Sequence, residues 1–536
     1  MLRAPLAGQT VQASHFEAPY GATNVYAGTT TSRRNTVTTA VAPADSPEQQ
    51  ASNKLNTGKT IAFFLSFIAL AAVILTPIAG LAMPAKIALG MLAFAVIMWV
   101  SEAVSYPVSA VMIVGLIAIM LTFAVDPETG EAIGASKGLS IAMSGFSSSA
   151  VALVAAALAL ATAMQATGLH RRLALYVLKF AGEKVSNIVI GAIVISIILA
   201  FFVPSATARA GAVVPILMGM VAAFGLAKES KLAALLVITA TQAVSIWNVG
   251  IKTAAAQNLV AVGFIEDQMG QTVSWGQWFI WAAPWSILMS IALYFIMRAA
   301  IKPEVESIDG GRELVEKQLA EMGPMTGAEK RLTAIAMLLL FFWATEGVLH
   351  PISSATITIV AVGFMLMPVI GVMDWKYAQQ QINWGTLVVF AAGISLGKFL
   401  LDTGAATWLS EATFGAIGLS SMPILAAIAL VSLFNILIHL GFASATSLAS
   451  ALIPVFIALA ATLDVPNGGI GFVIIQQFVI CFGFLLPVSA PQNMLAYGTG
   501  AFTSKQFLRT GIPLTIVAYL LILLLSATYW NWIGLV

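Results

Sequence analysis

Two polar clusters interrupt long apolar stretches of this chain, and they repeat one another. The first is FFVPSATARAGAVVP (Phe201 to Pro215) and the second is FASATSLASALIP (Phe442 to Pro454). The matched residues, all displaced by the same number of positions, are Ser205 and Ser444, Ala206 and Ala445, and Thr207 and Thr446. If a helix starts in each cluster, its first N–H groups suit an anion, and the hydroxyls add donors or cation ligands. Because such polarity is costly in an apolar segment unless it lines a cavity, we expect one binding site built in two halves.

Other uses of these residue types are open or excluded. Each hydroxyl could instead only cap a helix or pack between helices. The four histidines lie far apart, so the ligand spacing of a transition-metal site is absent. The one metal that the clusters could hold is sodium, as a coupling ion near Ser205 and Ser444. The single cysteine, Cys481, excludes an intrachain disulfide. No His, Asp, Glu or Cys set converges in the apolar segments and no GxxxxGKS/T motif occurs, so we expect no other cofactor and no enzyme.

Two further apolar segments are broken by polar residues, at Ile251 to Asn258 (IKTAAAQN) and at Val488 to Asn493 (VSAPQN). Unwound backbone at matching places in two halves of a membrane protein marks a transport site. The breaks supply polar groups from Gln492 and from the residues that we expect to contact a substrate, which are Thr253, Asn258, Ser489, Pro491 and Asn493. The alternative is a pair of kinks whose backbone groups are satisfied by neighbouring helices.

Three basic residues, Arg209, Lys252 and Lys398, fall inside apolar segments. A cation within a membrane is costly unless it is paired, so a function is the first hypothesis. Arg209 follows Ser205 by one helical turn and Lys252 lies in the first break, so both could compensate the charge of an anionic substrate or replace a bound cation. The alternative for both is a structural ion pair, and Lys398 could extend to the membrane surface from a helix end.

The composition places these motifs in a membrane. Of the 536 residues, 59% are hydrophobic and 9% are charged, and the mean hydropathy is +0.94. A soluble domain carries about 25% charged residues. Apolar runs that can cross a ~30 Å hydrocarbon core recur to the end of the chain, which predicts an all-α polytopic membrane protein with about 11 transmembrane helices plus two hairpins. The net charge of +2 and the lack of a basic run exclude nucleic acid as an expected partner, and membrane lipid surrounds the chain.

The order of motifs repeats, so two halves of the chain share one plan. Trp99-Val-Ser-Glu102 recurs as Trp343-Ala-Thr-Glu346, and Asn258 recurs as Asn493. Before the repeats we predict a disordered tail at 1–58 and an extra first transmembrane helix at 59–80. The first repeat spans 87–300, with a hairpin at 187–223 and a broken helix at 232–264, and a cytoplasmic linker follows at 301–330. The second repeat spans 331–533, with a hairpin at 423–461 and a broken helix at 468–500.

The distribution of charge predicts the orientation. With the tail inside, most of the 25 lysines and arginines lie in proposed cytoplasmic segments, and the outer segments keep only Lys86 and Lys137. The positive-inside rule therefore places the N-terminus in the cytoplasm. The number of crossings between the halves is odd, so the two repeats are inverted, each with a re-entrant hairpin and a broken helix.

The stretches VPSATARAGAVVPI and FASATSLASALIPV resemble the paired Ser-Asn-Thr hairpins of the divalent-anion:sodium symporter family. NWGTLVVFAAGISLGKFLLDTG (Asn383 to Gly404) and SAPQN also resemble that family, and the similarity runs over about residues 87–533. The resemblance implies two inverted repeats, a homodimer and elevator-type alternating access. It also implies di- or tricarboxylate substrates of the succinate, malate, 2-oxoglutarate and citrate class, or else sulfate.

Departures from the family pattern bear on coupling. Ala206 and Ala445 replace the asparagines, so a carboxylate donor and a sodium ligand are missing from each tip. The SATAR form with Arg209 resembles the bacterial and plastid exchangers (citrate/succinate, tartrate/succinate and 2-oxoglutarate/malate type), although Leu448 stands where that branch implies a histidine. We therefore expect an anion exchanger in a bacterial inner membrane. The alternatives are a sodium-coupled dicarboxylate or sulfate symporter and a location in the plastid inner envelope.

Overall fold

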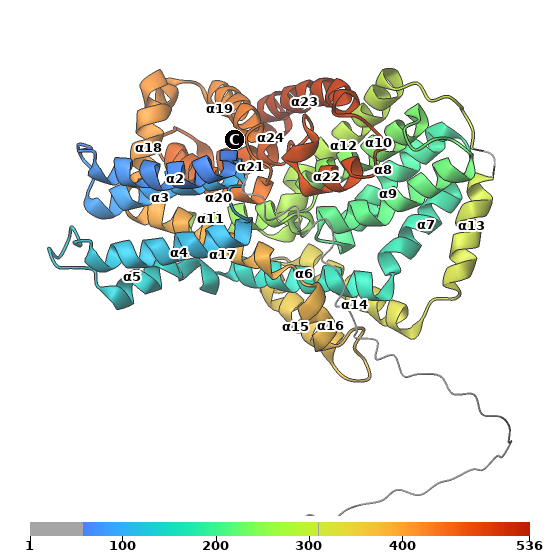
Figure 1. Ribbon diagram of the computed structural model, residues 1–536, viewed down its shortest axis with the longest axis horizontal. Coiled ribbons are helices and arrows are strands. Elements are labelled where there is room, and N and C mark those ends of the chain that lie inside the picture. Colours follow the sequence, from blue (N-terminus) through green and yellow to red (C-terminus); the bar gives the residue numbers. More distant parts are fainter. Residues whose placement is uncertain (1–56, 309) are drawn as a thin grey trace, which may run out of the picture. The chain divides into compact units, whose positions relative to one another are not determined.

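The computed structural model describes residues 57–308 and 310–536 (Figure 1). The predicted tail at 1–58 lies outside the described residues except for its last two positions, which begin the first helix. Helices, turns and isolated bridges make up the described part, with no β-strand in it. Ten of the described helices are long and apolar enough to cross a membrane. The predicted all-α polytopic fold is confirmed.

In chain order the α-helices are α2 (Thr57–Leu75), α3 (Met83–Ser101), α4 (Tyr106–Phe123), α5 (Ala135–Ala142), α6 (Ser149–Thr167), α7 (Leu169–Ala181), α8 (Val185–Phe202), α9 (Ala206–Ala223), α10 (Lys231–Gly250), α11 (Ala256–Met269), α12 (Trp275–Ala300), α13 (Gly311–Met322), α14 (Gly327–Thr345), α15 (Ser354–Leu366), α16 (Trp375–Gln381), α17 (Trp384–Asp402), α18 (Ala405–Thr413), α19 (Ile424–His439), α20 (Ala445–Ala460), α21 (Ile470–Ile480), α22 (Pro491–Tyr497), α23 (Ser504–Ala527) and α24 (Tyr529–Trp532).

The two halves contain the same motifs in the same order. Helices α8 and α9 form the first hairpin and α19 and α20 form the second, with the Ser-Ala-Thr clusters at their turns. Each hairpin is followed by a broken helix, α10 to α11 and α21 to α22. The second break is wider than VSAPQN indicated, because α21 ends at Ile480 and α22 begins only at Pro491. Pro487 and Pro491 have no N–H to donate, so neither can continue a helical ladder through this segment.

The halves interlock around the broken helices. Helix α9 of the first hairpin packs on α22, and α20 of the second hairpin packs on α11. Helix α10 is buried along its length after its first residue, which its nearly continuous apolar and small residues allow. Gly397 of α17 lies so close to Phe264 and Pro454 that a Cβ would stand 2.3 Å from the Phe264 ring. Small residues therefore let α17 approach α11 and α20 closely.

The predicted linker at 301–330 contains a helix, α13, and is fastened to the first half by a buried ion pair. Arg172 Nε donates to Glu329 Oε1 at 2.6 Å, and Arg172 Nη1 donates to the carbonyl oxygen of Gly323 at 2.8 Å. The side chains of Arg172 and Glu329 are 3% and 1% exposed. Removing one partner of such a pair strands a buried charge, which is far more damaging than losing an exposed pair.

We expect Glu329→Ala to destabilise the protein by about 3–5 kcal/mol, seen as a lower melting temperature in detergent. The matched control is Glu316→Ala on α13, because Glu316 is 40% exposed and pairs at the surface with Arg312 and Lys179. That change should cost about 1 kcal/mol or less. Equal losses in the two variants would show that burial does not govern the contribution of the Arg172–Glu329 pair.

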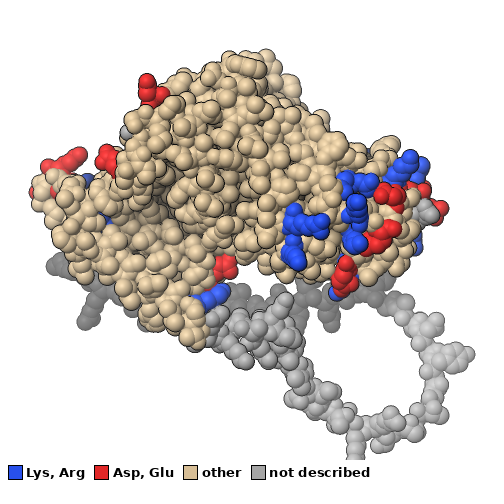
Figure 2. Space-filling view, turned by 90° about the horizontal axis from the view of Figure 1, so that it is seen from above, with Lys and Arg blue, Asp and Glu red and all other residues tan. Residues whose placement is uncertain are grey.

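Charged side chains gather at the ends of the molecule. Figure 2 shows most of the visible lysines and arginines at one end, the end that carries α13 in Figure 1. Asp126, Glu128 and Glu131 lie between α4 and α5, at the opposite end. The positive-inside rule predicts that the α13 end faces the cytoplasm.

We expect an impermeant thiol reagent, added from outside the cell, to label a cysteine at Lys137 and to spare one at Lys228, in a Cys481→Ala background. The two lysines are a matched pair, because their side chains are 60% and 64% exposed and differ in predicted side. Both cysteines should react after the membrane is permeabilised. Labelling of both in intact cells, or of Lys228 alone, would contradict the predicted orientation.

Candidate substrate-binding site

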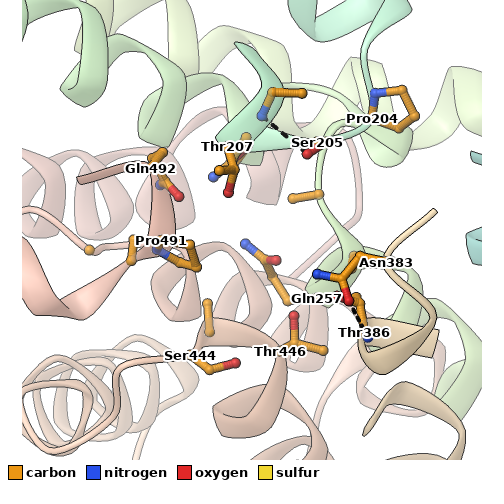
Figure 3. A pocket seen from close by; sticks show the side chains of 18 of the residues that line it. Pro204, Ser205, Thr207, Gln257, Asn383, Thr386, Ser444, Thr446, Pro491 and Gln492 are labelled. Atoms are coloured by element: carbon orange, nitrogen blue, oxygen red, sulfur yellow. Dashed lines mark hydrogen bonds between the residues drawn. The ribbon is translucent and has the colours of Figure 1, made fainter. Parts of the chain in front are cut away.

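A cavity of about 760 Å³ lies between the two hairpin tips and the two breaks. Figure 3 shows Ser205 and Thr207 on one side of it, Ser444 and Thr446 on the opposite side, and Gln257 between them. The residues predicted from the sequence that line it are Ser205, Ala206, Thr207, Ser444, Ala445, Thr446, Ser489 and Pro491. The structure thus brings both clusters to one cavity, as the repeat indicated.

The serines at the two tips cap helices. Ser205 has φ −147° and ψ 111°, and Ser444 has φ −136° and ψ 112°, so the chain is extended immediately before each helix. Ser205 Oγ accepts a hydrogen bond from the N–H of Ala208 at 3.3 Å, and Ser444 Oγ accepts one from Ser447 at 3.2 Å. The helix-cap alternative therefore holds for both serines, and each one fixes a helix start at the cavity wall.

The threonines differ from the serines. Among the described residues, neither the Thr207 nor the Thr446 hydroxyl has a hydrogen-bond partner, and both side chains line the cavity. They stand beside the first backbone N–H groups of α9 and α20, the donors that a helix leaves unpaired. Each tip therefore presents hydroxyl and N–H donors to the cavity.

The electrostatics of the cavity favour an anion. Within the described residues, no Asp, Glu, Lys or Arg side chain lines it. The starts of α9, α11 and α20 all face it, and a helix N-terminus carries about half a positive charge. Such converging N-termini bind phosphate or carboxylate groups without a fixed counter-charge at the contact itself.

Arg209 lies behind the first tip and does not line the cavity. The side chain is fully buried, and Nη2 donates to Asn248 Oδ1 and, at 2.9 Å, to the carbonyl oxygen of Ala254 in the first break. Nε and Nη1 have no partner in the described structure, and no carboxylate pairs with this guanidinium there. The structural ion pair weighed for Arg209 is thus not formed with any described residue.

Lys252 and Thr253 face away from the cavity as well. Lys252 Nζ donates to the carbonyl oxygen of Val273 at 2.5 Å, and Thr253 Oγ1 accepts from Trp275 Nε1 at 3.3 Å. Lys252 lines a separate small cavity of about 160 Å³ together with Glu266 and Glu346. Lys398 is half-buried near Asp267 and Asp402, at the end of α17.

The two predicted asparagines hold the breaks rather than the cavity wall. Asn258 Nδ2 donates to the carbonyl oxygen of Asn248 at 2.6 Å, and Asn493 Nδ2 donates to that of Gly483 at 2.7 Å. These equivalent contacts satisfy backbone groups that the interrupted helices leave without partners. Neither asparagine lines the cavity, so their role there is positioning.

Sequence reasoning missed several residues that do line the cavity. Gln257 is one of them: it precedes Asn258 as Gln492 precedes Asn493, so the repeat relates it to Gln492, a polar residue that the sequence did mark, and that signal could have found it. Tyr106 comes from the start of α4, where no motif marked it. Asn383 and Thr386 open the stretch from Asn383 to Gly404 that resembles the family, but nothing in that stretch singled them out as contacts. His439, the last residue of α19, also lines the cavity.

A helical fold with membrane-spanning helices and a cavity between two repeated hairpin tips is typical of a membrane transport protein. The chain belongs to the family described as sodium:sulfate symporter transmembrane region, which matches residues 57–536. The resemblance drawn from the hairpin sequences is confirmed. Because this is a family of transporters, the expectation that the chain is not an enzyme is confirmed as well.

Individual relatives agree with this assignment. A membrane protein of Cupriavidus necator is 49% identical over 458 residues, which cover 85% of this chain and 89% of that protein. The sodium-dependent dicarboxylate transporter SdcS of Staphylococcus saprophyticus is 24% identical over 80% of this chain and 82% of the relative. The L-tartrate/succinate antiporter of Escherichia coli is 27% identical over 74% and 81%. The solved YdaH transporter of Alcanivorax borkumensis shares the fold, with a TM-score of 0.52 at 15% identity over 82% of this chain and 99% of that one.

Proposed function

We propose that this protein is a secondary transporter that exchanges di- or tricarboxylates, such as succinate, malate, 2-oxoglutarate or citrate, across the membrane. The observation that carries the proposal is the cavity between the two tips, where helix N-termini meet threonine hydroxyls that have no partner, and no acidic side chain lines it, among the described residues. A dicarboxylate has two separated anionic ends, and the two tips offer two separated sets of donors. The relatives SdcS and the L-tartrate/succinate antiporter support this substrate class.

We infer exchange, rather than symport, from Arg209, the buried cation behind the first hairpin tip. Arg209 keeps its charge at any physiological pH, and no described carboxylate neutralises it. An empty carrier would have to reorient with this buried cation uncompensated, whereas a bound dianion compensates it. Return of the carrier should therefore require substrate, which is antiport.

The residues near Ser205 do not fit a sodium ion. A sodium site needs several oxygens that converge on the ion, and Ala206 and Ala445 bring none from their side chains. In the first half, Asn248 Oδ1 and the carbonyl oxygen of Ala254 already accept from Arg209, and Ser205 Oγ caps α9. The guanidinium therefore uses the oxygens that a cation would need.

We expect proteoliposomes loaded with succinate to take up labelled succinate when choline replaces sodium, and vesicles that are empty inside to take up almost none. The same vesicles with malate, 2-oxoglutarate, citrate or sulfate inside would rank the counter-substrates. Uptake into empty vesicles that rises with an imposed sodium gradient would instead establish symport, the alternative that the sodium-dependent relative SdcS favours. Counterflow of sulfate alone would exclude the dicarboxylate class.

The mode of movement, the oligomeric state and the location of the protein belong to the same proposal. We infer elevator-type movement of the hairpins and broken helices, a homodimer, and a bacterial inner membrane with the N-terminus in the cytoplasm. The bacterial relatives support the location over the plastid envelope. Exposed apolar side chains along α2, α4, α12 and α23 are available to lipid or to a second copy of the chain.

A further inference from the structure

His439 places an unsatisfied basic nitrogen at the wall of the cavity. The side chain is 3% exposed, and its Nε2 lies 3.3 Å from the carbonyl oxygen of Ser489 in the second break. A carbonyl oxygen only accepts hydrogen bonds, so Nε2 carries the hydrogen and, in a neutral ring, Nδ1 carries the lone pair. Among the described residues, Nδ1 has no partner although it is buried. A buried acceptor without a donor is costly, and a proton on Nδ1 would turn it into a donor.

His439 has a counterpart in Arg209 by its contact and not by its position in the repeat, where Leu448 is the equivalent of Arg209. Arg209 donates to the carbonyl oxygen of Ala254 in the first break, and His439 contacts the equivalent carbonyl oxygen, that of Ser489, in the second. Ala254 and Ser489 are displaced by the same number of positions as Asn258 and Asn493. Each half therefore sets one basic side chain against its own broken helix. The charge is permanent in the first half and titratable in the second.

No described acidic side chain lines the cavity beside His439, so a charge on its imidazole would be compensated only by a bound substrate. The other titratable side chains on the cavity wall are Tyr106, His170 and Cys481. Of the helices packed against α19, α21 carries no charged residue, and the charged or titratable residues of α23 are Lys505, Arg509 and Tyr519, whose hydroxyl donates to the carbonyl oxygen of Ala429 on α19 at 3.0 Å. Helix α20, which follows α19 in the hairpin, carries no charged residue. The acids closest to His439 in the sequence are Asp464 and Glu411, which is exposed on α18, and Glu102 accepts a hydrogen bond from Tyr106 of the cavity wall. No described carboxylate is thus paired with this imidazole.

We propose that His439 is a proton-binding site, which takes one proton from water onto Nδ1 when a dianionic substrate enters the cavity and returns it to water when the substrate leaves. The inference rests on the proposed function. In the empty cavity the buried imidazole is neutral, because nothing offsets a charge there. A dianion supplies the offsetting charge. Arg209 and the imidazolium then balance its two negative charges, so the loaded carrier is neutral at the site.

The first experiment measures the proton directly. Purified protein in weakly buffered detergent solution is mixed with succinate at about pH 8, where both succinate carboxyls are ionised. The wild-type protein should take up about one proton per bound succinate, read with a pH-indicator dye. His439→Gln should bind succinate with almost no proton uptake, because the amide can still donate to the Ser489 carbonyl oxygen but does not titrate.

The second experiment uses the pH dependence of affinity in the counterflow assay. Above the pKa of the free imidazole, the apparent KM of the wild type should rise up to tenfold per pH unit between about pH 7 and 9, and that of His439→Gln should stay flat. His350→Gln is the control, because His350 lies outside the cavity and both of its ring nitrogens have partners: Nδ1 accepts from the N–H of Ile352 at 3.2 Å, and Nε2 lies 3.0 Å from the carbonyl oxygen of Phe342. This variant should keep the wild-type slope.

The outcomes separate the two proposals. Succinate binding and counterflow by the wild type without proton uptake would overturn the role of His439 and leave the exchanger intact. Equal proton uptake by wild type and His439→Gln would assign the proton to another group and would also overturn it. If no di- or tricarboxylate is bound or exchanged by the wild type, the proposed function fails, and the inference fails with it. The wild-type measurement decides even if the variant does not fold.

Discussion

Arg209→Met is expected to abolish dicarboxylate exchange while leaving the protein as stable as the wild type or more stable. At an effective dielectric of ~20, a cation about 6–8 Å from an anionic charge contributes about 2–3 kcal/mol, so a dianion should lose at least about 10²-fold in affinity. The stability follows from burial. A buried guanidinium that no described carboxylate pairs with destabilises the fold, and methionine fills similar space without charge. The two acceptors that lose their donor, Asn248 Oδ1 and the carbonyl oxygen of Ala254, cost about 1–3 kcal/mol each, and Asn248 lines the cavity, where water can replace the donor.

Two measurements on each variant test this prediction: counterflow in proteoliposomes and melting temperature in detergent. The matched control is Arg209→Lys, which keeps the charge but cannot reproduce both hydrogen bonds to Asn248 and Ala254. It should retain measurable exchange. Wild-type counterflow in Arg209→Met would remove Arg209 from charge compensation, and a large fall in melting temperature would assign it a structural role instead.

The repeat made the tips predictable, because the pairing of Ser205 with Ser444 and of Thr207 with Thr446 can be seen in the letters alone. A polar cluster inside an apolar run needs a cavity or a partner, and two matched clusters share one cavity most simply. The helix bounds followed from the same physics. Apolar length fixes a crossing, and the polar stretches at 251–258 and 488–493 indicate an interrupted helix, which the structure places at 251–255 and, earlier than expected, at 481–490.

The direction in which each side chain points was not predictable from the sequence. In each break a glutamine and an asparagine are adjacent, and a shift of one residue on a helix turns a side chain by about 100°. The sequence favoured Asn258 and Asn493 as contacts, with Gln492 named beside Asn493, whereas Gln257 and Gln492 line the cavity and the asparagines bond to backbone carbonyl groups behind it. Tyr106 and Asn383 belong to helix starts far away in the chain, and only the packing of α4 on α17 brings them to the site. His439 likewise comes from the helix before the second tip, where position alone gave no signal.

Replacing Thr207 or Thr446 by valine is expected to raise the apparent KM for succinate by about 10- to 150-fold in each single variant. A hydrogen bond to a charged group contributes about 1.5–3 kcal/mol, and valine keeps the shape of threonine while removing the hydroxyl. Because neither hydroxyl has a partner among the described residues, its loss strands no group in the substrate-free protein, so folding should be unaffected. A rise in KM therefore reports lost contact with the ligand. Replacing the capping serines, Ser205 or Ser444, would not separate that loss from the loss of a helix cap.

The single and double variants of the two threonines test whether one substrate molecule contacts both hairpin tips. If the two carboxylates of a single dianion are held one at each tip, the free-energy losses of Thr207→Val and Thr446→Val should add in the double variant, because the hydroxyls lie apart and share no partner. The control is Thr413→Val, since Thr413 is exposed on α18 and bonds to the carbonyl oxygen of Leu409 at 2.6 Å, away from the cavity. It should leave the KM unchanged. A large effect of Thr207→Val with none of Thr446→Val would mean that the substrate binds at the first tip alone, and wild-type KM in both variants would place the substrate elsewhere.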